Sequence, residues 1–158
     1  MKTAVVYYTL DGNCALVADE IRSQLNADLI RLYTKDEKKR GIIGKLFWGG
    51  GMAVRREKPP LKPYTFDPAA YDLIVIGAPV WAGFPAPPVE TFLSETNIKS
   101  KKIALFVCHG GGKGGSLEKF KALLDGNEIA SVTDFRQPAR AGSEKVKQQI
   151  ADWVKGFI

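Results

Sequence analysis

The chain has 158 residues, a formal net charge of +6 at pH 7 and 45% hydrophobic residues. This length suits one domain with a substantial core and is too short for two ordinary domains. Its two cysteines give no disulfide framework, and no segment approaches the roughly 20 apolar residues of a membrane span. The N-terminal segment reads as a strand and lacks the pattern of a signal peptide. We therefore expect a single cytoplasmic domain over residues 1–158.

Strand and helix patterns alternate along the chain. Strands are expected near residues 2–8, 27–33, 72–78, 102–108 and 128–135. Helices are expected near residues 14–26, 87–96, 116–125 and 143–157. The run from Leu73 to Ile76 is apolar at every position, so both faces of that strand need cover. The pattern predicts an α/β fold, a doubly wound five-stranded parallel sheet in three αβα layers.

The first strand ends in a short polar turn, and the chain restarts at once as a helix. Thr9, Gly12 and Asn13 can bend the backbone tightly and direct N–H groups inward. A helix N-terminus has unpaired N–H groups and about half a positive charge, so it favours an anion. We predict a phosphate cradle closed by the side chains of Thr9 and Asn13. An ordinary strand–turn–helix junction is the alternative.

The turn lacks the Lys and Ser/Thr of a P-loop and the three glycines of the dinucleotide fingerprint. It resembles the flavodoxin phosphate loop, Ser/Thr-x-Thr-Gly-Asn-Thr/Ser, which holds the phosphate of FMN. Thr9, Gly12 and Asn13 match that loop, whereas Asp11 and Cys14 depart from it. An acidic Asp11 would repel phosphate unless its side chain points to solvent. The resemblance implies phosphate contacts from Thr9, Leu10, Asp11, Gly12, Asn13 and Cys14.

The third strand runs into a loop rich in Gly and Pro that carries an indole, Trp81. Open α/β sheets bind ligands outside the carboxyl ends of their strands. Trp81 there offers a stacking surface for a planar ring, or else it fills a hydrophobic corner. In flavodoxins the matching loop wraps the flavin ring. The resemblance therefore implies ring contacts from Pro79, Val80, Trp81, Ala82 and Gly83.

The fourth strand is followed by His109 and by five glycines within residues 110–115. Glycines let the backbone approach a planar ligand closely, although a flexible surface loop would have the same composition. The resemblance implies contacts to the pyrimidine edge of the flavin from His109, Gly110, Gly111 and Gly112. The loop has no aromatic residue, which indicates that one flavin face is open. His109 is either a proton donor near reduced flavin or a simple loop residue.

Four residues have plainer interpretations. His109 is the only histidine, and we expect no metal site. Cys14 and Cys108 both lie at the ligand side of the predicted sheet, but the topology of the resembled family sets their strands apart. We interpret both as small buried core residues. Asp134 lies on the predicted edge strand, and we interpret it as a charge that protects this edge and not as a catalytic residue.

A basic insertion, residues 34–66, separates the second and third strands. Residues 31–62 hold ten Lys and Arg against three Asp and Glu. Such a patch attracts acidic partners, phosphorylated cofactors, nucleic acid or anionic lipid, although any single charged residue there fits a solvated face better. Phe47 and Trp48 beside three glycines fit a lid, a docking edge or core filling.

The resemblance to flavodoxin-like proteins covers nearly the whole chain and implies the strand order 2-1-3-4-5. It also implies FMN as a non-covalent cofactor through which the protein carries electrons to a redox partner protein. One alternative is an NAD(P)H-dependent FMN reductase of quinones or flavins, so whether the chain is an enzyme stays open. Another is a flavin-less module that binds a protein or nucleic acid through the basic insertion, although a nucleic-acid partner is the less favoured of the two.

Overall fold

The computed structural model describes residues 1–35, 51, 55 and 57–158. Within them, five parallel strands form a sheet in the order β2-β1-β3-β5-β6. Their bounds are β1 Thr3–Tyr8, β2 Asp28–Leu32, β3 Leu73–Trp81, β5 Lys102–His109 and β6 Glu128–Arg136. A two-residue strand, β4 (Phe84–Pro85), pairs antiparallel with the end of β3. The predicted fold class and order of parallel strands are confirmed, with β4 as the unpredicted addition.

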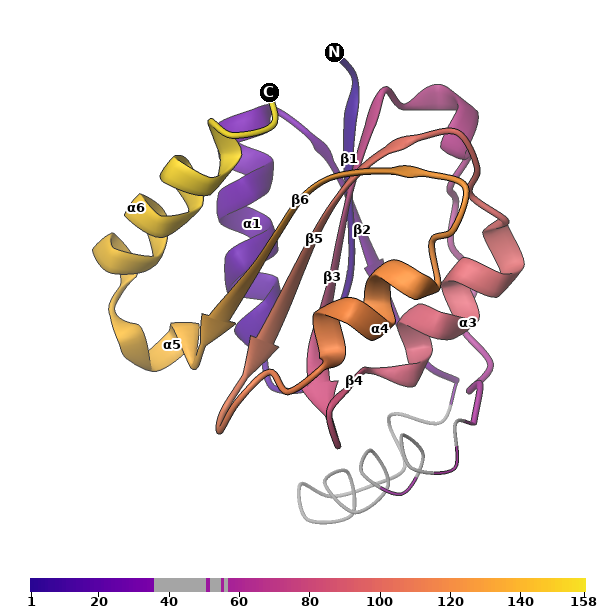
Figure 1. Cartoon of the computed structure of the whole chain (residues 1–158), viewed down its shortest axis with the longest axis horizontal. Coiled ribbons are helices and arrows are strands. Elements are labelled where there is room, and N and C mark those ends of the chain that lie inside the picture. The colour runs from indigo at the N-terminus through magenta and orange to yellow at the C-terminus, as the bar shows by residue number, and fades with distance from the viewer. Residues whose placement is uncertain (36–50, 52–54, 56) are drawn as a thin grey trace.

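Helices cover both faces of the sheet (Figure 1). Helices α1 (Asn13–Leu25) and α6 (Ser143–Val154) lie on one face, and α3 (Pro87–Thr96) and α4 (Ser116–Ala122) lie on the other. A four-residue helix, α5 (Pro138–Ala141), and a 3₁₀ turn (Pro68–Ala70) were not predicted. Three αβα layers result, as the sequence indicates.

The central strands are buried on both faces, which explains why both faces carry helices. In β1, Val5 and Tyr7 pack into the core beneath α1 and α6, whereas Val6 and Tyr8 pack into the core beneath α3 and α4. Side chains of a strand point alternately to opposite faces, so one apolar run supplies both cores. Because the strands are parallel, their carboxyl ends lie at the same edge of the sheet, and the loops that follow them come together there.

Gly77 of β3 lies against the Phe106 ring of β5. It pairs with Phe106, and a Cβ at residue 77 would lie 2.0 Å from the Phe106 ring. Phe106 is fully buried, so its ring has little room to move. We expect Gly77→Ala to lower the free energy of unfolding by about 1–3 kcal/mol, the usual cost of overpacking.

Urea denaturation measures this loss. Gly111→Ala is the matched control, because a Cβ there meets nothing within 4 Å. The control should stay within about 0.5 kcal/mol of the parent protein. Equal stability of the Gly77 and Gly111 variants would contradict the packing argument.

The two ends of the basic insertion meet beside β2. Thr34 and Leu61 form an isolated antiparallel bridge, and the Lys35 N–H donates to the Pro60 carbonyl at 3.0 Å. The predictions for Phe47 and Trp48, and for the charged residues within 36–50 and at residue 56, fall outside the described residues.

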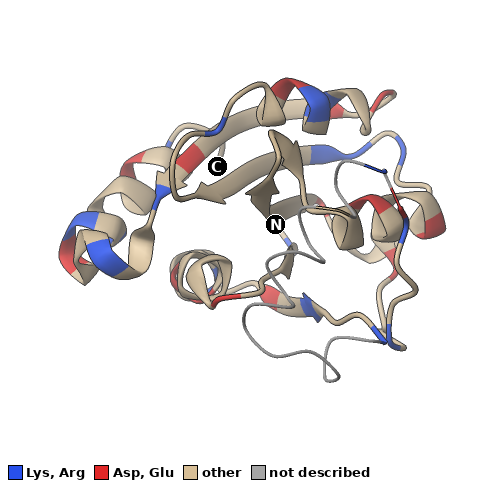
Figure 2. Cartoon of the chain, turned by 90° about the horizontal axis from the view of Figure 1, so that it is seen from below, with Lys and Arg blue, Asp and Glu red and all other residues tan. Residues whose placement is uncertain are grey.

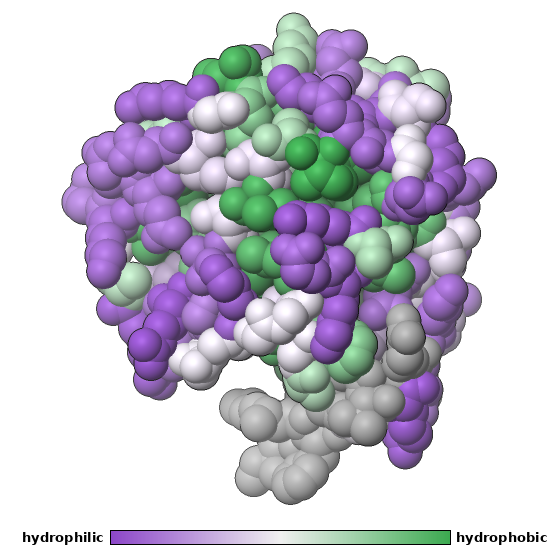
Figure 3. Space-filling model, in the orientation of Figure 1, coloured by the Kyte–Doolittle hydropathy of each residue, from purple (hydrophilic) through white to green (hydrophobic). Residues whose placement is uncertain are grey.

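The surface of the molecule mixes charged and apolar regions. Figure 2 looks onto the carboxyl ends of the strands, where charged residues lie mainly on the surrounding helices and loops. On the face shown in Figure 1, hydrophobic residues gather near the centre, between hydrophilic regions (Figure 3). Among the described residues, none of the helices is both long enough and apolar enough to cross a membrane.

Candidate functional site

A cleft of about 480 Å³ opens at the carboxyl ends of the strands. This volume lies within the range of small-molecule and cofactor sites, and the position is the usual one in open α/β sheets. Of the residues predicted from the sequence, the cleft is lined by Leu10, Asp11, Asn13, Pro79, Val80, Trp81, Ala82, His109 and Gly110. The other predicted residues are not among its lining: Thr9, Gly12, Cys14, Gly83, Gly111 and Gly112.

The turn before α1 is built by short-range hydrogen bonds. The buried Thr9 hydroxyl oxygen accepts from the Gly12 N–H at 3.0 Å. Gly12 has φ +92°, a left-handed conformation that favours glycine, and its carbonyl accepts the first helical bond from Leu16. Thr9 and Gly12 therefore fix the shape of the turn, although neither lines the cleft.

Asp11 folds back onto the start of α1. Its carboxylate accepts from the Asn13 N–H at 3.0 Å and from Asn13 Nδ2 at 2.8 Å. Although Asp11 is exposed, its side chain occupies the helix N–H group that a bound anion would use. The Asp11 carboxylate would therefore compete with an anion for the Asn13 N–H. Its side chain does not simply point to solvent.

The start of α5 forms a wall of the cleft that the sequence analysis missed. Gln137, Ala139 and Arg140 line it, and the Ala139 N–H donates to Asn13 Oδ1 at 3.1 Å. Arg140 adds a cation to the cleft lining and follows Ala139, which bonds Asn13. The available signal was Pro138, because proline at a first helical position marks a helix start directly after β6.

Trp81 is the last residue of β3 and leads into a two-residue turn. Ala82 (φ +50°) and Gly83 (φ +77°) both have positive φ, as a tight hairpin with strand β4 requires. The indole meets the Tyr8 ring edge-on, with centroids 5.6 Å apart, and also lines the cleft. Trp81 therefore packs against the core on Tyr8 and also presents part of its surface to the cleft, so the two interpretations from the sequence are compatible.

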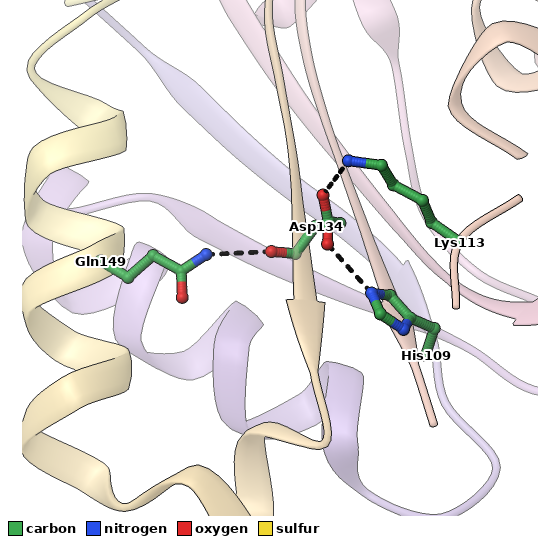
Figure 4. Close-up of polar contacts among 4 residues, drawn as sticks. All are labelled: His109, Lys113, Asp134 and Gln149. Atoms are coloured by element: carbon green, nitrogen blue, oxygen red, sulfur yellow. Dashed lines mark hydrogen bonds and ion pairs between the residues drawn. The ribbon is translucent and has the colours of Figure 1, made fainter. Parts of the chain in front are cut away.

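A polar cluster lies at the end of β5 (Figure 4). His109 Nε2 lies 2.9 Å from Asp134 Oδ2, and Lys113 Nζ lies 2.5 Å from Asp134 Oδ1. Partial burial raises the pKa of the Asp134 carboxyl, but the hydrogen bonds from Lys113 and His109 outweigh it and hold that pKa below its ordinary value. Asp134 is therefore ionised at neutral pH. The interpretation of Asp134 as a charge that protects the edge strand was incomplete, because Asp134 also holds His109, a residue of the cleft lining.

The glycine loop after β5 leaves open space beside this cluster. A Cβ at Gly111 or Gly112 would meet nothing within 4 Å, and both residues are exposed. A planar molecule could therefore lie against this backbone without displacing side chains.

The two cysteines are neighbours, contrary to the sequence-based expectation that their strands keep them apart. Burial raises the pKa of the Cys14 thiol, and a hydrogen bond with Cys108 raises it further. Both are buried within one core cluster, although Cys108 also lines the cleft. A raised pKa disfavours the thiolate, so Cys14 is a poor nucleophile.

Solved flavoproteins share this fold. The flavoprotein from Lactobacillus acidophilus NCFM, solved in complex with FMN, has a TM-score of 0.76 and 22% identity, covering 97% of this chain and 98% of that one. General stress protein 14 from Treponema denticola, also in complex with FMN, gives 0.60 and 14%, covering 98% and 97%. Two-electron reduced flavodoxin from Megasphaera elsdenii gives 0.57 and 16%, covering 95% and 98%.

No protein-family model and no curated protein sequence matches the chain. The class of protein is therefore assigned from the structure. This chain has the flavodoxin-like fold, with a cleft at the carboxyl ends of the strands. At these identities the likeness establishes the fold alone.

Proposed function

We propose that this protein binds FMN non-covalently in the cleft and carries electrons through it. The proposal rests on one observation: three loops contribute residues to the same cleft. They are the turn at the start of α1, the loop at the end of β3 that carries Trp81, and the glycine loop after β5. Each suits one part of FMN, namely the phosphate, the ring face and the ring edge. Proteins that share the fold, from L. acidophilus and T. denticola, were solved with FMN.

The donor groups of the cleft fit this cofactor. The phosphate would be held at the turn over residues 9–14, with Asn13 and Arg140 as its polar contacts. The ring would lie between residues 79–83 and residues 109–112. FMN, when bound, supplies the electron or hydride chemistry, while the protein binds, orients and shields it.

Asp11 gives this proposal a specific test. Its carboxylate occupies the Asn13 N–H and adds a negative charge beside the proposed phosphate. Like charges near a protein surface repel by one to a few kcal/mol. We expect Asp11→Asn to tighten FMN binding about tenfold, equivalent to about 1.4 kcal/mol, and to leave riboflavin binding unchanged. Asn remains a good residue at a helix start.

Flavin fluorescence titration measures both affinities. The matched control is Asp19→Asn, which removes the same charge from an exposed position on α1 outside the cleft lining. Weaker FMN binding by the Asp11 variant would mean that the carboxylate supports the loop instead of competing with the ligand.

A second candidate is an NAD(P)H-dependent FMN reductase of quinones or flavins. The open space at Gly111 and Gly112 favours it, because a second planar molecule would have room beside the flavin. Mixing FMN-loaded protein with NADH or NADPH without oxygen separates the two. Bleaching within seconds, followed by reoxidation with a quinone, supports the reductase. Reduction only by a ferredoxin-type donor supports the carrier.

The redox partner of a carrier is proposed to be acidic. Arg55, Lys58 and Lys62 belong to the basic insertion, and a basic patch attracts partners of opposite charge. Exposed charges are screened over about 8 Å at physiological ionic strength, so the rate of reduction by such a partner should fall as salt rises.

A further inference from the structure

The only histidine of the chain is held in one orientation at the cleft wall. Its side chain is 8% exposed, and Nε2 faces Asp134 at 2.9 Å. Because Asp134 is ionised, it accepts this bond and Nε2 carries the hydrogen. The other ring nitrogen, Nδ1, is buried and has no hydrogen-bond partner among the described residues. In Figure 4 it lies on the side of the ring away from the dashed bond to Asp134.

The charge of Asp134 is already balanced before His109 gains a proton. Lys113 bonds the second carboxylate oxygen, so the cluster with neutral His109 has no net charge. A proton on Nδ1 would leave the cluster with one positive charge and a buried N–H without an acceptor. Both are costly unless a negative charge lies nearby. An anion in the cleft would offset both costs.

The other groups around the ring set the same requirement. Arg136 of β6 is the register partner of His109, and Arg140 of α5 lines the same cleft. Both are cations and oppose a further positive charge. Asp11, from the turn before α1, lines the cleft with the opposite sign but is engaged by Asn13. From α6, the neutral Gln149 side chain donates to the Asp134 carbonyl at 2.9 Å.

We propose that the Asp134–His109 pair couples reduction of the bound flavin to the uptake of a proton. The inference rests on the proposed FMN function. Two-electron reduction with uptake of one proton would leave one negative charge on the ring system; a reduced nicotinamide supplies both as a hydride, whereas dithionite supplies the electrons and solvent the proton. His109 then takes a second proton from solvent, forming an Nδ1–H bond, so the cleft gains no net charge. Charge near the flavin ring is one means by which a protein tunes it.

Reduction potentials measured against pH test the coupling. The FMN-loaded parent protein is compared with His109→Gln and Asp134→Asn, and with Asp152→Asn as the control. Asp152 lies on α6, where it bonds Gln148 and Lys155 and lies outside the cleft lining. One extra proton per two electrons corresponds to about 30 mV per pH unit. We expect the slope to be steeper by this amount in the parent and the control than in the His109 and Asp134 variants.

Nitrogen NMR of His109 supplies a second readout that needs no variant, and a single histidine makes its signals unambiguous. We expect a neutral Nε2–H ring in the oxidised complex and a doubly protonated ring in the reduced complex. Normal FMN binding with unchanged His109 signals and equal slopes would overturn the coupling alone. A parent protein that binds no FMN would overturn the proposed function, and the coupling with it.

Discussion

Riboflavin is expected to bind this protein about a hundredfold more weakly than FMN. The two ligands differ only by the phosphate, which would meet the Asn13 end of α1 and Arg140. Hydrogen bonds to charged groups contribute about 1.5–3 kcal/mol each. Two such bonds contribute about 3–6 kcal/mol, and repulsion from the Asp11 carboxylate offsets about 1.4 kcal/mol of this, which leaves about 3 kcal/mol, or about a hundredfold in affinity. Fluorescence titration of apoprotein with each flavin measures the ratio.

Arg140 provides the control on this ratio. Arg140→Gln should weaken FMN binding and leave riboflavin binding nearly unchanged, since only FMN carries the anion. Arg22→Gln removes the same charge from the last turn of α1, at the other end of the helix, and should change neither affinity. Equal affinities of the parent protein for FMN and riboflavin would contradict the phosphate assignment.

Replacing Trp81 is expected to have the next largest effect on flavin binding. Aromatic stacking contributes about 0.5–1.5 kcal/mol beyond the area it buries. Trp81→Ala should therefore weaken FMN binding by about tenfold and leave the bound flavin less quenched. Because the indole also packs against Tyr8, the same variant should lose folding stability.

Trp153→Ala separates these two effects. Trp153 packs against Phe157, with ring centroids 4.8 Å apart, and its indole N–H donates to Ser131. Its loss should lower stability without changing FMN affinity or quenching. If the Trp81 variant behaves in the same way, Trp81 serves the core alone.

The sheet was predictable because its signal is local. Runs such as Leu73–Ile76 are apolar at every position, which requires cover on both faces, and the polar breaks between runs set the order of elements. The turn from Thr9 to Asn13 could be predicted for the same reason, because residues adjacent in sequence shape it.

The rest of the candidate site depends on contacts between distant residues. His109 and Asp134 are 25 residues apart, and their bond follows from the register of β5 on β6, which includes a shift between Ile103 and Ala104. Cys14 and Cys108 meet only once α1 is packed on the sheet. The Asp11 carboxylate was visible in the sequence, but its direction depends on the backbone of the turn. No sequence pattern specifies any of these.

Titration of the purified apoprotein with FMN tests the central claim most directly. Flavin fluorescence and the visible absorption spectrum report whether the ring enters the cleft. We expect saturable quenching with one FMN per chain, accompanied by a shift of the flavin absorption bands. A folded protein that leaves both signals unchanged at excess FMN would contradict the account and favour a flavin-less binding module.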